Sequence, residues 1–208
     1  IIQYSISGIP YDVWVFPGLI FIVSSIGLYP IIYREFFDLR VHKKVLVNIA
    51  LAPFSKSYLV FSSLIVGTFE AMLMTLFAAL LYIGIVSIHI TLFNFIFLIL
   101  CLIFYLFLIG NIYILISISI DAITTMILAS FSLFIFIVFG NSFIIELAFF
   151  PPMVETLLKY NPISFPFQSY QMFVTTGNID WISFLIQIFI IYGLFLLNGF
   201  LLKLKLRQ

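Results

Sequence analysis

The chain alternates five long apolar runs with shorter, more polar segments. No Asp, Glu, Lys or Arg occurs between Glu70 and Asp121. That interval can hold two membrane-crossing helices, because one crossing takes about 20 apolar residues. The runs lack the alternation of polar and apolar positions typical of barrel strands, so they predict helices. The predicted spans are about 13–32, 58–85, 92–117, 123–145 and 181–202.

The segment between the fourth and fifth spans, residues 146–180, is apolar but rich in proline. Its prolines are Pro151, Pro152, Pro162 and Pro166. Proline removes a helix hydrogen bond, so one uninterrupted helix is excluded here. The pattern predicts broken, re-entrant helices on the outer side, where protein or water must cover the backbone. The predicted fold is therefore an all-α membrane protein, with one transmembrane domain over residues 1–208.

Composition supports a hydrocarbon environment. The 208 residues are 64% hydrophobic and 8% charged, with a mean hydropathy of +1.30. A soluble domain carries about 25% charged residues, which cover its water-facing surface. This chain has too few charged residues to cover such a surface. A net charge of +1 gives no field that would attract nucleic acid. The single cysteine, Cys101, and two histidines expected on opposite sides predict no metal site.

The basic residues predict an orientation. The segment after the first span and the C-terminal tail hold every Lys and Arg except Lys159. Five crossings place both clusters on one side, which the positive-inside rule makes cytoplasmic. Ile1 is then outside and Gln208 is inside. Because the chain begins with Ile1 rather than Met, we expect it to be a portion of a longer polypeptide.

Four short elements, in order, resemble a known family. They are Tyr-Asp-Val-Trp-Val-Phe-Pro-Gly-Leu-Ile at 11–20, Arg34-Glu35, Pro-Phe-Ser-Lys at 53–56, and Pro151-Pro152 followed by Asn161-Pro162. Together they resemble ABC-2 type transporter permeases, and the resemblance covers essentially the whole chain. The family usually has six spans, and the first has no counterpart here. The run 36–52 is also longer than in the family and lacks its Gly.

The resemblance implies the membrane subunit of an ATP-driven exporter in a prokaryotic cell membrane. The chain has no Gly-x-x-x-x-Gly-Lys-Ser/Thr loop, so it is not expected to be an enzyme by itself. ATP and Mg would bind a cytoplasmic ATPase subunit, and a second permease, identical or different, would complete the assembly within membrane lipid. The substrate class stays open among glycans, glycolipids, lipids, peptides and drugs.

The cytoplasmic segment 33–57 is the predicted coupling segment for the ATPase. Its charges do not gather on one face at 100° per residue, so we expect an elbow rather than one amphipathic helix. The alternative is a plain anchor on anionic lipid. The candidate coupling residues are Arg34, Glu35, Asp38, Arg40, Lys43 and Lys44.

Three further predictions concern residues outside the coupling segment. The predicted outer gate consists of Pro151, Pro152, Asn161 and Pro162. Glu70 lies near the middle of the second span, where an ionisable group usually faces the bundle interior or water. It belongs either to the export path or to a hydrogen bond that pins helices together. Asp121, in the turn between the third and fourth spans, is predicted to cap a helix.

A rival interpretation is an ATP-independent channel or a structural subunit of a hydrophobic membrane complex. The composition supports it equally, because any multispan subunit is this apolar. It leaves the basic segment and the proline-rich outer segment without an explanation. It also predicts no ATPase partner, which separates it from the exporter.

Overall fold

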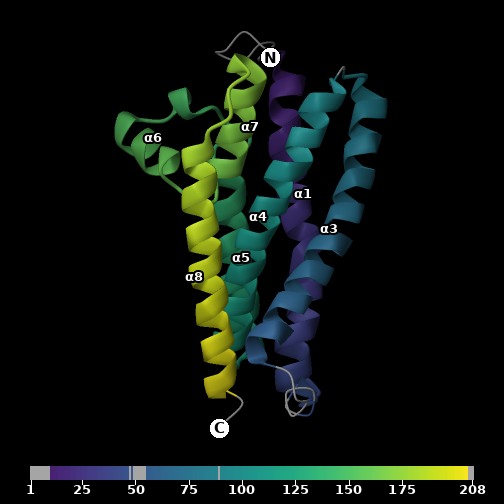
Figure 1. The fold of residues 1–208 in the computed structure, drawn as a ribbon, viewed down its shortest axis with the longest axis vertical. Helices are drawn as coiled ribbons and strands as arrows, with labels where there is room; N and C mark the ends of the chain where they lie inside the picture. The colour runs from purple at the N-terminus through teal and green to yellow at the C-terminus, as the bar shows by residue number, and fades with distance from the viewer. Residues whose placement is uncertain (1–9, 47, 49–54, 89, 206–208) are drawn as a thin grey trace.

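The computed structural model describes residues 10–46, 48, 55–88 and 90–205. Within these ranges the chain is helical and contains no strand. Five helices run along the long axis in alternating directions (Figure 1). They are α1 (Tyr11–Ile32), α3 (Lys56–Val86), α4 (Leu92–Ser119), α5 (Ile123–Phe139) and α8 (Trp181–Lys205). Predictions that concern Ile1, Pro53, Phe54, His89, Gln208 and most of 47–54 lie outside the described residues.

The bundle has two ends, which differ in the segments they hold. The base, at the bottom of Figure 1, holds the turn between α4 and α5 and the end of α8. The top holds the beginning of α1 and of α8. Four helical segments are long and apolar enough to cross a membrane, which supports an all-α membrane protein. They are Tyr11–His42, Lys56–Val86, Leu92–Ser119 and Trp181–Lys205.

Local signals explain where the long helices begin and end. Ser55 caps the start of α3, since its Oγ accepts the N–H of Tyr58 at 3.1 Å. Thr91 caps α4 in the same way, accepting the N–H of Asn94 at 3.3 Å. Ser87 ends α3 in the left-handed region, at φ 55°. These boundaries lie close to the predicted spans because the capping residues flank the apolar runs.

α5 is shorter than predicted, and it ends at Phe139 rather than at residue 145. The N–H of Gly140 bonds to the carbonyl of Phe136, and the Asn141 side chain donates to the carbonyls of Phe136 and Ile137. The end of the helix is thus capped from within the apolar run. At about 1.5 Å per residue α5 is roughly 26 Å long, slightly less than a bilayer core of about 30 Å.

The first helix also runs past the predicted end of the first span, near residue 32. The helix continues without interruption as a π-helix, η1 (Tyr33–His42). Phe36 and Phe37 are fully buried there, and η1 packs against α4, so the apolar contacts carry the helix onward. The chain turns after His42, and Lys44 has a positive φ of 54°. The expected elbow therefore lies at Lys43–Lys44.

α4 forms the centre of the core. It packs against α1, α3, α5, α8 and η1. Tyr105 of α4 hydrogen-bonds Ser25 of α1 at 2.6 Å, and its ring meets Phe21 edge-on. Nearer the base, Asn198 of α8 donates to the backbone and side-chain oxygens of Asn111, at 2.9 and 3.0 Å. Cys101, also on α4, is fully buried.

The outside of the bundle is apolar. Large hydrophobic side chains lie exposed along the outward faces of α3 and α8, among them Phe69, Phe77, Ile182 and Phe189. A soluble monomer rarely exposes so much contiguous apolar surface. In the hydrocarbon of a bilayer, exposing this apolar surface costs no free energy. The surface therefore fits a membrane environment, as the composition does.

The proline-rich segment folds into short helices, as predicted. They are η2 (Leu147–Phe149), α6 (Pro152–Lys159) and α7 (Phe165–Thr176). Pro152 and Pro166 sit in the first turns of α6 and α7, where a missing N–H costs nothing. α7 packs into the bundle against α4 and α8, whereas α6 projects beside it (Figure 1).

Candidate functional site

The predicted coupling residues lie at the base, on η1 and the turn after it. Arg34 is on the outside, with 60% of its side chain exposed and a 4.0 Å contact to Glu35. Asp38 accepts from Lys43 Nζ at 3.0 Å and lies 3.2 Å from His42 Nδ1. Lys43 and Lys44 are exposed. This outer group presents positive charge that another protein could contact.

Arg40 points inward instead. Its side chain is 11% exposed and donates to the Ser117 carbonyl at 2.8 Å, to the Ile120 carbonyl and to the Asp121 carboxylate. The carbonyls at a helix end lack intrahelical donors, so Arg40 caps the end of α4 and complements its dipole. Arg40 therefore joins η1 to the end of α4 at the base.

Asp121 joins three elements of the base. One carboxylate oxygen accepts from Arg40, and the other accepts from Lys205 Nζ at 2.8 Å. The predicted role as a helix cap is wrong, because α5 begins after Ala122 without a side-chain cap. We call these residues the Arg40–Asp121–Lys205 network. It ties η1 to the α4–α5 turn and to the end of α8.

The network predicts a pH dependence of stability. The hydrogen bond from Arg40, followed by that from Lys205, holds the pKa of Asp121 below its ordinary value of 3.8. A lowered pKa adds stability above the ordinary value that is lost as the pH falls through the folded value. The thermal unfolding midpoint of wild type should therefore exceed that of Asp121→Asn at pH 7, and this difference should shrink below about pH 4. A difference that stays constant down to pH 3 would contradict this role.

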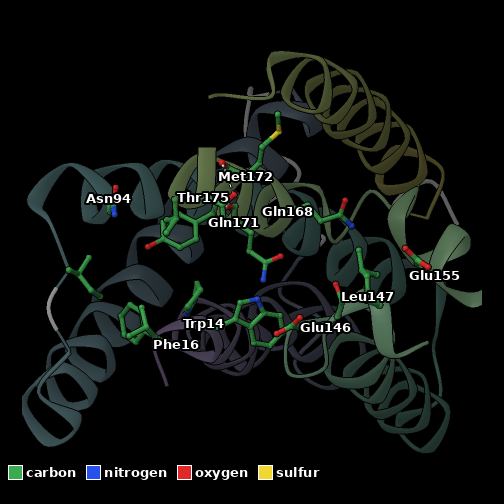
Figure 2. Close-up of a pocket in the computed structure, with 17 residues that line it drawn as sticks. Trp14, Phe16, Asn94, Glu146, Leu147, Glu155, Gln168, Gln171, Met172 and Thr175 are labelled. Carbon is green, nitrogen blue, oxygen red and sulfur yellow. Dashed lines mark hydrogen bonds between the residues drawn. The ribbon is translucent and has the colours of Figure 1, made fainter. Parts of the chain in front are cut away.

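A cavity of about 400 Å³ lies at the top, between the beginnings of α1 and α4, the segment after α5, and α7. Apolar side chains such as Trp14 and Phe16 line it together with polar ones. Figure 2 shows Gln171 pointing from α7 toward Trp14 of α1. Gln171 Nε2 is buried and makes no hydrogen bond with a described residue. The other labelled polar residues are Asn94, Glu146, Glu155, Gln168 and Thr175.

This mixed lining can hold a molecule with both polar and apolar parts. Amides and carboxylates would bind hydroxyl or amino groups, while the Trp14 ring offers an apolar wall. These cavity residues were not predicted from the sequence. Gln168 and Gln171 are three residues apart and so share a helix face. Two glutamines spaced in this way within an apolar segment were an available signal.

The predicted gate residues lie beside the cavity and do not line it. Asn161 connects the turn between α6 and α7 to the end of α5. Its Nδ2 donates to Asn141 Oδ1 at 2.6 Å, and its Oδ1 accepts the N–H of Ile163 at 3.2 Å. Pro151 and Pro152 start α6, and Pro162 lies in the turn after it. These residues position the segment.

Glu70 lies halfway along α3 and is exposed on the surface of this single chain. The packed face of α3 consists of small residues such as Gly67 and Ala71, which lie against α1. Glu70 falls outside that face and forms no hydrogen bond or ion pair with a described residue. A carboxyl group in the middle of an apolar surface is costly in hydrocarbon. It requires water or another chain beside it.

Comparison with known proteins adds no relative. No family model, curated protein or solved structure matches the chain. Within the ranges that the structure describes, no three His, Cys, Asp or Glu residues gather as metal ligands.

Proposed function

We propose that the chain is the membrane subunit of an ABC-2 type exporter, crossing a prokaryotic cell membrane five times with its base in the cytoplasm. The observation that carries this proposal is the charged end of the first helix. η1 extends beyond the apolar part of α1 and presents Arg34, Lys43 and Lys44 outward. A cytoplasmic ATPase, which binds ATP and Mg, docks on this end.

Force reaches the spans along two routes. η1 continues α1 without a break, so a displacement at the base tilts α1 directly. The Arg40–Asp121–Lys205 network carries the same displacement to the end of α4, the start of α5 and the end of α8. The exposed charges thus serve coupling to the ATPase, and the inward ones serve transmission.

The top serves substrate exit. α6 and α7 act as re-entrant helices on the outer side, positioned by Asn161 and the prolines, and the cavity beside α7 receives the polar part of the substrate. A second permease subunit lies against α3 and, with water of the export path, surrounds Glu70. The lining favours an amphipathic substrate.

The test is purification of the tagged chain from its native membrane in gentle detergent, with partners identified by mass spectrometry. The expected partner carries a Gly-x-x-x-x-Gly-Lys-Ser/Thr loop, and the complex hydrolyses ATP. The triple variant Arg34→Glu, Lys43→Glu, Lys44→Glu should lose this partner and its ATP hydrolysis. Lys159→Glu, exposed on α6 at the other end of the fold, should retain the partner.

Two results would count against the exporter. A wild-type preparation without a nucleotide-binding partner and without ATP hydrolysis would favour the channel or structural subunit. Retention of the ATPase by the triple variant would place the coupling surface elsewhere on the base.

A further inference from the structure

One stripe of α3 faces away from the rest of the bundle. α3 lies along one side of the bundle (Figure 1) and packs inward against α1, α4 and α8. The stripe advances along the helix in alternating steps of four and three residues, and every member is exposed. Its members, which we call the α3 seam, are Val66, Glu70, Leu73, Phe77, Leu80 and Gly84.

The spacing of the α3 seam is that of a contact between two helices. Alternating steps of four and three residues keep one stripe turned toward a partner helix when two helices supercoil. Leu73, Phe77 and Leu80 are each more than half exposed, and a Cβ at Gly84 would meet nothing within 4 Å. The described part of the chain therefore leaves the α3 seam without a partner helix.

Glu70 is the polar member of the α3 seam. Between Ser63 and Tyr82 it is also the only exposed polar residue of α3, because Thr68 and Thr75 are buried. Intramembrane carboxyl groups are costly and usually pair with other polar groups or water. Acyl chains offer neither, so the surface around Glu70 is incomplete in the single chain.

A second copy of the chain supplies the missing polar group by symmetry. In a parallel two-fold contact, a residue at the axis faces its own counterpart at the same depth in the membrane. A protonated carboxyl group both donates and accepts, so two of them form reciprocal hydrogen bonds. A single polar position in an otherwise apolar seam also fixes the register and the number of helices.

We propose that the second permease subunit is a second copy of this chain, packed in parallel along the α3 seam. The two Glu70 carboxyl groups pair at the two-fold axis, between the apolar side chains of Val66 and Leu73 from each copy. This inference rests on the proposed function, which places another permease against α3, and it identifies that permease as the same polypeptide.

The first test measures self-association of the purified whole chain in detergent, by energy transfer between donor-labelled and acceptor-labelled chains. Wild type should form a dimer. Glu70→Leu should dissociate about tenfold more readily, because it removes hydrogen bonds between the helices and apolar side chains gain little from each other over lipid or detergent. Glu70→Gln should stay within about threefold of wild type, because an amide also donates and accepts.

The matched control is Tyr192→Phe, which removes a polar group from the exposed face of α8. It should self-associate within about twofold of wild type. A wild-type chain without energy transfer would overturn the second copy. Glu70→Leu that associates like wild type, or Glu70→Gln that is as weak as Glu70→Leu, would overturn the carboxyl pair.

The second test is disulfide cross-linking in the native membrane. A disulfide requires two Cα atoms about 4.4–6.8 Å apart, so Leu73→Cys, one turn from Glu70, should give a covalent dimer on mild oxidation. Phe189→Cys, exposed on α8, should not. Cys101 is buried and adds no link in either variant. A cross-link through Phe189→Cys instead of Leu73→Cys would place the second copy on α8.

The cross-linked product also separates this inference from the exporter. Mass spectrometry should find only peptides of this chain in it, and a different permease linked through Leu73→Cys would overturn the second copy while leaving an exporter intact. The energy-transfer measurement contains no ATPase. A dimer that copurifies with no ATPase would therefore support the α3 seam and count against the exporter.

Discussion

Gly18→Ala should lower the free energy of unfolding by about 3 kcal/mol, toward the upper end for an overpacked site. A Cβ at Gly18 would lie 1.9 Å from the carbonyl oxygen of Phe143 and 2.7 Å from its carbonyl carbon. Both are backbone atoms, so no side-chain rotation relieves the clash. α1 and the segment after α5 would have to move apart, which would disturb the packing of Phe21 against Phe143. Denaturant or thermal unfolding of the purified chain in detergent measures the loss.

Gly84→Ala and Gly193→Ala are the matched controls. Both glycines lie inside helices, and an added Cβ meets nothing within 4 Å. Alanine there should be neutral or should stabilise by about 0.5–1 kcal/mol, since it reduces the freedom of the unfolded chain. If Gly18→Ala unfolds at the wild-type midpoint, the close approach to Phe143 does not exist. The close approach to Phe143 would then no longer explain why Gly follows Pro17 in the first span.

Arg40→Met should lower the free energy of unfolding by about 2–3 kcal/mol, because it removes charge-assisted hydrogen bonds at a mostly buried site. Methionine keeps the apolar stem and removes the donors. The carbonyls of Ser117 and Ile120 lose their partner, and Asp121 keeps only Lys205. The same unfolding measurement in detergent tests this expectation.

Arg34→Met makes the same chemical change at an exposed position and should cost less than about 0.5 kcal/mol. Similar losses in the two variants would mean that Arg40 acts only as a surface charge. A double-mutant cycle of Arg40→Met with Asp121→Asn should be non-additive, because both changes break one hydrogen bond. Additive effects would contradict the network.

The sequence predicted the helices well where its signals are local. The apolar runs gave α3, α4 and α8, and the prolines gave the broken segment after α5. The end of α5 was missed, although Gly140-Asn141 is a known helix-stop signal. The continuation of α1 into η1 depends on burial of Phe36 and Phe37 against α4. That burial is a long-range contact, so the sequence analysis placed the end of the first span near residue 32, where the charges begin.

The functional residues were harder to separate. Arg34 and Arg40 look alike in the sequence, yet one faces outward and the other binds groups far along the chain, at Ser117 and Asp121. Only the packing of η1 against α4 distinguishes them. Glu70 differs, because the small residues Gly67 and Ala71 mark the packed face of α3. Helical periodicity could have shown that Glu70 lies outside it.

The burial of Cys101 has a practical consequence for topology. It is the only cysteine in the sequence, and it lies fully buried within α4. A membrane-impermeant maleimide should therefore leave Cys101 unlabelled, so this cysteine need not be removed. A cysteine introduced at Lys159 and another at Lys44, each in its own variant, would then report by labelling of intact cells which end of the bundle faces the medium.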